Sequence, residues 1–188
     1  LIYNLVIFFF FSGILIVNDD FVQFFLGQDF QDARYAIAIM IFRMFFIGWT
    51  NIMGIQILIP HNRNKEFMIS TTAPAIISVG LNLLFLPKLG YIGAAIVSVL
   101  TEALVWAIQL FFTRRYLKEV PIIGSMTKIV LASAIMYGLL LGSKTVIHFS
   151  PTLNVLVFVV LGGIIYLFAI LSLKVIDVKE LKQIIGKK

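Results

Sequence analysis

The chain has 188 residues, of which 61% are hydrophobic and only 13% charged, and its mean hydropathy is +1.04. Soluble domains are about 45–50% apolar and about 25% charged, and a core of this size cannot bury so much apolar surface. The sequence therefore predicts an all-α, polytopic membrane protein that uses the lipid bilayer as its solvent. It contains no cysteine and two histidines, which excludes thiolate chemistry and disfavours a metal site, so we expect no cofactor.

Six apolar segments are candidates to cross a bilayer, which takes about 20 residues per helix. We expect Asn18–Asp20 to close the first segment, which begins inside a hydrophobic run. Residues 21–27 are too few to cross and are predicted to lie at the interface, before an acidic loop. Residues 174–188 are rich in charged residues, and the apolar residues among them are spaced for a short amphipathic surface helix. The six segments are 1–17, 35–59, 67–86, 91–112, 122–141 and 153–173.

Basic residues are distributed unevenly between the two sets of connections that these six segments define. One set, with the C-terminal tail, carries ten basic residues, and the other carries three beside four aspartates. Because cytoplasmic loops are enriched in Lys and Arg, we predict that the first set and the C-terminus are cytoplasmic. The net charge of +6 is then a topology signal, and we expect no nucleic-acid partner. The ten are Arg63, Lys65, Arg114, Arg115, Lys118, Lys174, Lys179, Lys182, Lys187 and Lys188; the three are Arg34, Lys88 and Lys144.

Arg43 lies about 12 Å along the second predicted span, close to the bilayer midplane. An arginine there costs roughly 2.5–3.5 kcal/mol on insertion scales, so such residues face a bundle interior or a wet cavity. On a helix, Thr50 and Gly54 lie within about 20° of Arg43, and Asn51 lies about 80° away. This polar stripe is a candidate anion-binding site, because a planar guanidinium pairs well with phosphate. The alternative is an arginine held in a structural ion pair.

Glu102 is the one acidic residue deep in a predicted span, and Ser98 and Gln109 share its helix face. Its candidate roles are a partner for Arg43, an ion-coupling site and a contact for sugar hydroxyls; the alternative is a carboxyl that serves helix packing alone. On the third predicted span, Ser78 and Asn82 are candidate substrate contacts. Small hydroxyls and amides in membrane helices also commonly hold neighbouring helices together, which is the alternative there.

Residues 81–95 read LNLLFLPKLGYIGAA and join the third and fourth predicted spans through a tight turn. Together with Gln56–Pro60 before a basic loop, and with Thr101 and Glu102, this stretch resembles the polysaccharide flippases of the MOP superfamily. The resemblance covers residues 1 to about 116. One departure is Ser78, which stands where the family often has a second asparagine one helical turn before Asn82.

The resemblance implies a MATE-like helical bundle with two pseudo-symmetric lobes and a terminal helix pair, in the cytoplasmic membrane of a bacterium. Residues 1–116 would be four helices of the second lobe, 117–174 the terminal hairpin and 175–188 a cytoplasmic tail. The chain would then be the C-terminal part of a longer protein, with the missing N-terminal lobe as its partner. The implied substrate is a polyprenyl-diphosphate-linked oligosaccharide for O-antigen or capsule. Arg43 would meet its diphosphate, Glu102 would couple to an ion gradient, and the terminal hairpin would shelter the lipid tail.

Two other functions remain open at this stage. The first is a multidrug exporter of the same superfamily, which would favour acidic and aromatic residues for cationic drugs, whereas Arg43 favours an anionic substrate. The second is a membrane enzyme of polysaccharide assembly, a polymerase or glycosyltransferase. Phosphate-cradling loops, nucleophile elbows and metal-ligand spacings do not occur in the sequence, so we expect a protein that is not an enzyme.

Overall fold

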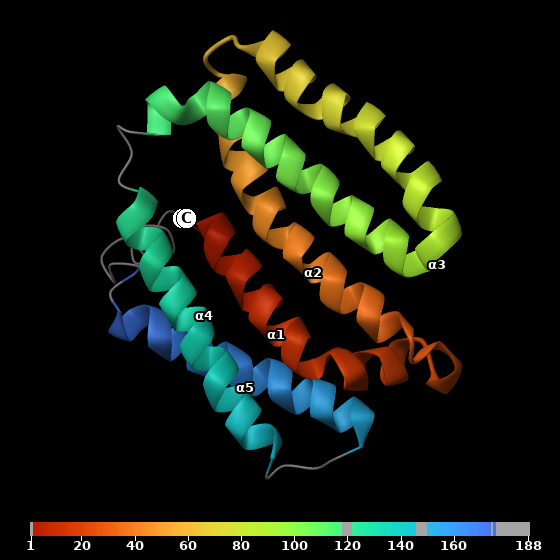
Figure 1. Cartoon of the computed structure of the whole chain (residues 1–188). Coiled ribbons are helices and arrows are strands. Elements are labelled where there is room, and N and C mark those ends of the chain that lie inside the picture. The colour runs from red at the N-terminus through yellow and green to blue at the C-terminus, as the bar shows by residue number, and fades with distance from the viewer. Residues whose placement is uncertain (1, 118–121, 146–149, 174, 176–188) are drawn as a thin grey trace, which may run out of the picture. The chain divides into compact units, whose positions relative to one another are not determined.

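The structure is a computed structural model that describes residues 2–117, 122–145, 150–173 and 175. Within these residues the regular structure is entirely helical (Figure 1), as the sequence predicts. The described part of the chain holds five helices long and apolar enough to cross a membrane. Its contacts form two compact units. We call residues 1–29 and 122–188 the three-helix unit, and residues 30–121 the hairpin unit.

The three-helix unit packs α1 (Ile2–Phe25) against α4 (Ile122–Lys144) and α5 (Pro151–Ser172). Met136 of α4 is fully buried at the centre of this packing. Its methyl carbon would lie 3.6 Å from a Cβ added at Gly13 of α1 and 3.0 Å from one added at Gly162 of α5. The small residues therefore let three apolar helices approach closely, as small residues do between membrane helices. Tyr166 of α5 adds a hydrogen bond of 2.9 Å from its hydroxyl to the carbonyl of Leu5.

A polar cluster ties the three helices together at one end of this unit. The Lys144 ammonium donates to the carbonyl of Ile16 at 2.8 Å and lies 3.6 Å from Oδ2 of Asp20. The Asn154 amide donates to Oδ1 of the same carboxylate at 3.1 Å. Asp20 thus has one partner from α4 and one from α5, although its side chain is only 14% exposed.

This cluster corrects the prediction for the first span. The helix does not close at Asn18–Asp20: α1 continues through these residues to Phe25, so residues 21–25 belong to a transmembrane-length helix and form no separate interfacial segment. The physical reason is that Asp20 is paired with Lys144 of α4 and Asn154 of α5, so it need not leave the helix for water. The chain turns just after α1, where Gly27 has a φ of +84°, and continues into a short 3-10 turn, η1 (Gln28–Phe30).

The hairpin unit begins with α2 (Ala33–Thr50), which continues directly into η2 (Asn51–Leu58). Together they correspond to the predicted span 35–59. The widened helical turn of η2 is a π-helix, and the backbone bond from Ile59 N to the Gly54 carbonyl, five residues back, is 3.2 Å. Nothing in the sequence pattern predicts this widening. Such π segments occur frequently at functional sites.

The long helix α3 (Asn64–Leu117) reverses direction at Gly90, whose φ of 55° and ψ of −138° are not helical. Figure 1 shows its two halves running side by side. Contacts join Arg63 to Phe112 and Ser70 to Gln109, and a Cβ at Gly93 would lie 2.7 Å from the carbonyl oxygen of Phe85. The two residues of each pair lie at about equal distances in sequence on either side of the predicted tight turn 87–90. We call residues 64–89 the outgoing half and residues 91–117 the returning half.

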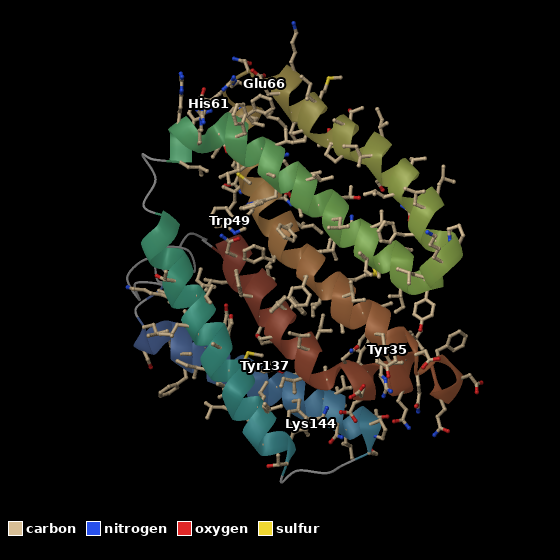
Figure 2. The ribbon with its side chains drawn as sticks, in the orientation of Figure 1. Tyr35, Trp49, His61, Glu66, Tyr137 and Lys144 are labelled. Atoms are coloured by element: carbon tan, nitrogen blue, oxygen red, sulfur yellow. The ribbon has the colours of Figure 1, made fainter. Side chains whose placement is uncertain are left out.

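The two halves of α3 contain the predicted spans 67–86 and 91–112, and α4 and α5 contain the last two. His61 and Glu66 lie at one end of the hairpin unit and Tyr35 at the other (Figure 2). The predicted tail helix, residues 174–188, lies outside the described residues except for Val175. The division into a lobe, a terminal hairpin and a tail stays a prediction, because it refers to a longer protein.

Candidate substrate-binding site in the hairpin unit

Arg43 of α2 and Glu102 of the returning half form an ion pair. The Arg43 Nε and Nη2 atoms both donate to Oε1 of Glu102, at 3.3 Å and 3.0 Å. The Arg43 side chain is 40% exposed and that of Glu102 is 18% exposed. Of the roles that the sequence left open for Glu102, the structure therefore shows the partner of Arg43. A charged pair this deep in apolar helices is costly, so it marks a candidate functional site.

Close packing against α3 explains why Arg43 meets Glu102. Gly54 follows Arg43 along the same predicted stripe, and a Cβ there would lie 2.7 Å from the Phe67 ring and 3.0 Å from Gln109 Nε2. The polar stripe that contains Arg43 and Gly54 therefore faces α3. The returning half of α3 contacts α2, η2 and the outgoing half. Phe46 of α2 adds a ring contact with Trp106, with the ring centroids 5.9 Å apart.

Thr50 and Asn51 mark the junction of α2 and η2. The Thr50 hydroxyl and the Asn51 amide both donate to the carbonyl of Ile47, at 3.1 Å and 3.2 Å. Thr50 is 9% exposed, so it belongs to the packed interior of the unit. The structure thus places these two predicted site residues on the helix that carries Arg43, next to the widened turn, with hydrogen bonds to their own helix.

Ser78 and Asn82 lie one turn apart on the outgoing half of α3. The Asn82 amide donates to the carbonyl of Ser78 at 2.9 Å and to its hydroxyl oxygen at 3.4 Å. Both side chains are half-buried. Their hydrogen bonds join them to each other, and no such bond connects them with the Arg43–Glu102 pair in the described structure. A role in substrate contact stays a prediction for both.

The sequence does not predict that two polar atoms of the returning half, one on Gln109 and one on Trp106, are buried without a hydrogen-bond partner in the described structure. Gln109 is 1% exposed, and its amide donates to the Ser70 hydroxyl at 3.3 Å. Its Oε1 atom and the Trp106 Nε1 atom are buried without a hydrogen-bond partner in the described structure. Trp106 and Gln109 follow Glu102 by four and seven residues, so helical spacing alone places them on its face. The sequence predicts from this spacing that Gln109 lies on the face of Glu102. It does not single out Trp106, because an indole is common in apolar helices.

In the part of the chain that the structure describes, no three His, Asp or Glu side chains come together to hold a metal ion. The candidate site is instead a cation held by one carboxylate, with buried polar atoms a turn or two away. A guanidinium in such a position can bind an anion through parallel N–H donors.

These features define a class: the chain is a polytopic helical membrane protein with an Arg–Glu pair inside its spans. Over 105 residues it is 32% identical to a protein of Escherichia coli (strain K12) that carries the description "Putative O-antigen transporter". The similar region covers 55% of this chain and 25% of that protein, so the chain spans about a quarter of the length of this relative. No family model matches the chain, and no solved structure matches it.

Proposed function

We propose that the chain is part of a flippase that moves polyprenyl-diphosphate-linked oligosaccharide repeat units across the cytoplasmic membrane of a bacterium. The observation that carries the proposal is the deep Arg43–Glu102 pair, which sits inside helices of transmembrane length. The partial likeness to an O-antigen transporter supports the substrate class. The C-terminus is cytoplasmic in this proposal, because the ten basic residues then lie on the side that favours them.

Arg43 is the proposed contact for the diphosphate. Its guanidinium is always charged, presents five donors in a fixed fork and is well matched to phosphate oxygens. Glu102 is the proposed coupling residue, because a carboxylate deep in the membrane is a natural place to link substrate movement to an ion gradient. Thr50, Asn51, Ser78 and Asn82 are the proposed contacts for sugar hydroxyls.

The lipid tail of such a substrate needs an apolar path. An apolar groove of about 450 Å³ runs between α1 and α5 of the three-helix unit, and Leu5, Phe9, Tyr166 and Leu167 contribute to its lining. Its walls are almost wholly hydrocarbon, so a polyprenyl chain would be as well solvated there as in the bilayer. We propose this groove, within its own unit, as a place that can hold an apolar chain.

The test uses cells depleted of the gene that encodes the intact protein. We expect lipid-linked repeat units to accumulate on the inner leaflet and surface polysaccharide to be lost. Wild-type protein restores both, and an Arg43→Ala variant does not, because the diphosphate loses its cationic contact. Arg34→Ala is the matched control: it removes the same charge from the same helix, near the helix end. Substrate binding and flipping undiminished by Arg43→Ala would contradict the assignment of Arg43.

The same depletion separates the flippase from the alternative exporter. An unchanged pool of lipid-linked repeat units, together with new sensitivity to cationic drugs, would replace the flippase proposal by a multidrug exporter.

A further inference from the structure

The guanidinium of Arg43 uses one of its two forked edges in the pair with Glu102. Its Nε and Nη2 atoms lie side by side, and both donate to the single oxygen Oε1 of Glu102, at 3.3 Å and 3.0 Å. Bidentate recognition of a phosphate takes two such parallel donors. A phosphate that binds this edge must therefore take the place of the Glu102 carboxylate.

The exposure of the two side chains favours such a replacement. The Arg43 side chain is 40% exposed, whereas that of Glu102, on α3, is 18% exposed. An anion that approaches from the exposed side meets the guanidinium first. The carboxylate then acts as an internal anion that keeps Arg43 paired while the site is empty, since an unpaired charge in apolar surroundings is costly.

Trp106 offers a donor for the displaced carboxylate. It lies one helical turn beyond Glu102, a spacing at which two side chains on a helix can meet. Its Nε1–H group is buried and has no hydrogen-bond partner in the described structure. Buried donors of this kind are rare, because an unmade hydrogen bond costs about 1–3 kcal/mol. A carboxylate that leaves Arg43 would satisfy it.

We propose that Arg43 and Glu102 form an exchange site: a phosphate group of the substrate displaces the Glu102 carboxylate from Arg43, and the carboxylate moves to the indole N–H of Trp106. This inference rests on the proposed function and deepens it, because it makes substrate binding and the release of Glu102 one event. Arg43 and Glu102 then do not act as two independent sites.

The experiment measures the binding of inorganic pyrophosphate to the intact protein in lipid nanodiscs by calorimetry. Glu102→Gln replaces a charged competitor by a neutral one, so we expect binding to tighten about tenfold. Glu66→Gln is the matched control: it makes the same change in the other Arg–Glu pair of the hairpin unit, whose Nη2–Oε1 distance is 2.8 Å. We expect this control to leave pyrophosphate affinity unchanged.

A second pair of variants tests the role of Trp106. Trp106→Phe retains an aromatic ring against Phe46 but removes the N–H donor, so we expect weaker pyrophosphate binding. In a Glu102→Gln background no carboxylate is released, and the same substitution should then have no effect. This non-additivity distinguishes the exchange from a purely structural role of the indole. Melting curves check that the Glu102→Gln protein is folded. Its curve is compared with that of Glu102→Asp, a variant at the same position that keeps the charge.

Three results would overturn the exchange. Wild-type protein that binds pyrophosphate with no tightening in Glu102→Gln would refute it and leave the proposed anion site standing. Equal tightening in Glu66→Gln would show a general effect of net charge. Absence of pyrophosphate binding in both wild type and Glu102→Gln would refute the exchange and the proposed role of Arg43 together.

Discussion

Gly54 is a residue of η2 that both halves of α3 approach closely. An added Cβ would lie 2.7 Å from a Phe67 ring carbon and 3.0 Å from the Gln109 amide nitrogen, which is hydrogen-bonded to Ser70. We expect Gly54→Ala to destabilise the protein by about 1–3 kcal/mol through overpacking, measured as a lower Tm in detergent. Gly80→Ala is the control, because nothing apart from its chain neighbours and its own helix backbone lies within 4 Å of its Cβ position, and alanine favours a helix over glycine by about 1 kcal/mol. Equal stability of the two variants would contradict the close packing.

For single residues, the sequence predicts the site membership of charged side chains better than that of neutral ones. Arg43 and Glu102 stand out because a charge in a hydrocarbon span is expensive and must find a partner or a ligand. Their pairing was therefore among the expected roles. Trp106 carries no such signal, since an indole is compatible with a membrane helix. That its N–H is buried without a partner depends on the packing of Phe46 and α3 around it, which no residue pattern contains.

The reversal inside α3 depends on one residue. Gly90 has a φ of +55° and a ψ of −138°, a backbone conformation that is essentially restricted to glycine. We expect Gly90→Ala to lower stability by about 1–3 kcal/mol through backbone strain, visible as a lower Tm. Gly142→Ala tests the same side-chain change without strain, because Gly142 lies in α4 and has open space around its Cβ position. Equal Tm values for the Gly90→Ala and Gly142→Ala proteins would contradict the claim that the turn needs glycine at position 90.

The last turns of α1 depend on contacts with α4 and α5. Asp20→Ala removes the carboxylate that Lys144 and Asn154 share. We expect a loss of about 1–3 kcal/mol, because Lys144 and Asn154 each lose their contact with the carboxylate, and faster hydrogen exchange of the amides in residues 20–25. Asp29→Ala is the control at an exposed position of the same unit, where substitutions usually change stability by less than about 0.5 kcal/mol. Unchanged exchange in Asp20→Ala would show that α1 needs no such support.

Helix existence is predictable from this sequence, whereas helix ends and irregularities are less so. Each predicted span corresponds to a helix or half-helix, because runs of about 20 apolar residues have few other structures available in lipid. The end of α1 was predicted wrongly, since the partners of Asp20 come from segments more than 120 residues away. The π-helix η2 contains Gly54 and no proline, and it packs against α3.

Within each of the two units, contacts show which helix ends and connections lie at the same end of that unit. In the three-helix unit, Asp20 in the last turns of α1 meets Lys144 at the end of α4, so these two helix ends lie together. In the hairpin unit, Tyr91 donates to the Asp32 carbonyl at one end, and the His61 and Tyr116 rings are in tilted contact at the other. These groupings agree with the two sets of connections drawn from the charge pattern. Which set faces the cytoplasm stays a prediction.

Thiol labelling can test that prediction, because the chain contains no cysteine. A membrane-impermeant maleimide applied to intact spheroplasts should label Lys88→Cys and Thr145→Cys. It should label Asn62→Cys and Arg115→Cys only after the membrane is permeabilised, since the positive-inside rule places their connections in the cytoplasm. The unsubstituted protein gives the background. Reversed labelling of all four positions would contradict the orientation but keep the span count. Labelling of Lys88→Cys and Asn62→Cys from the same side would contradict the hairpin unit itself, because an odd number of crossings must separate these two residues.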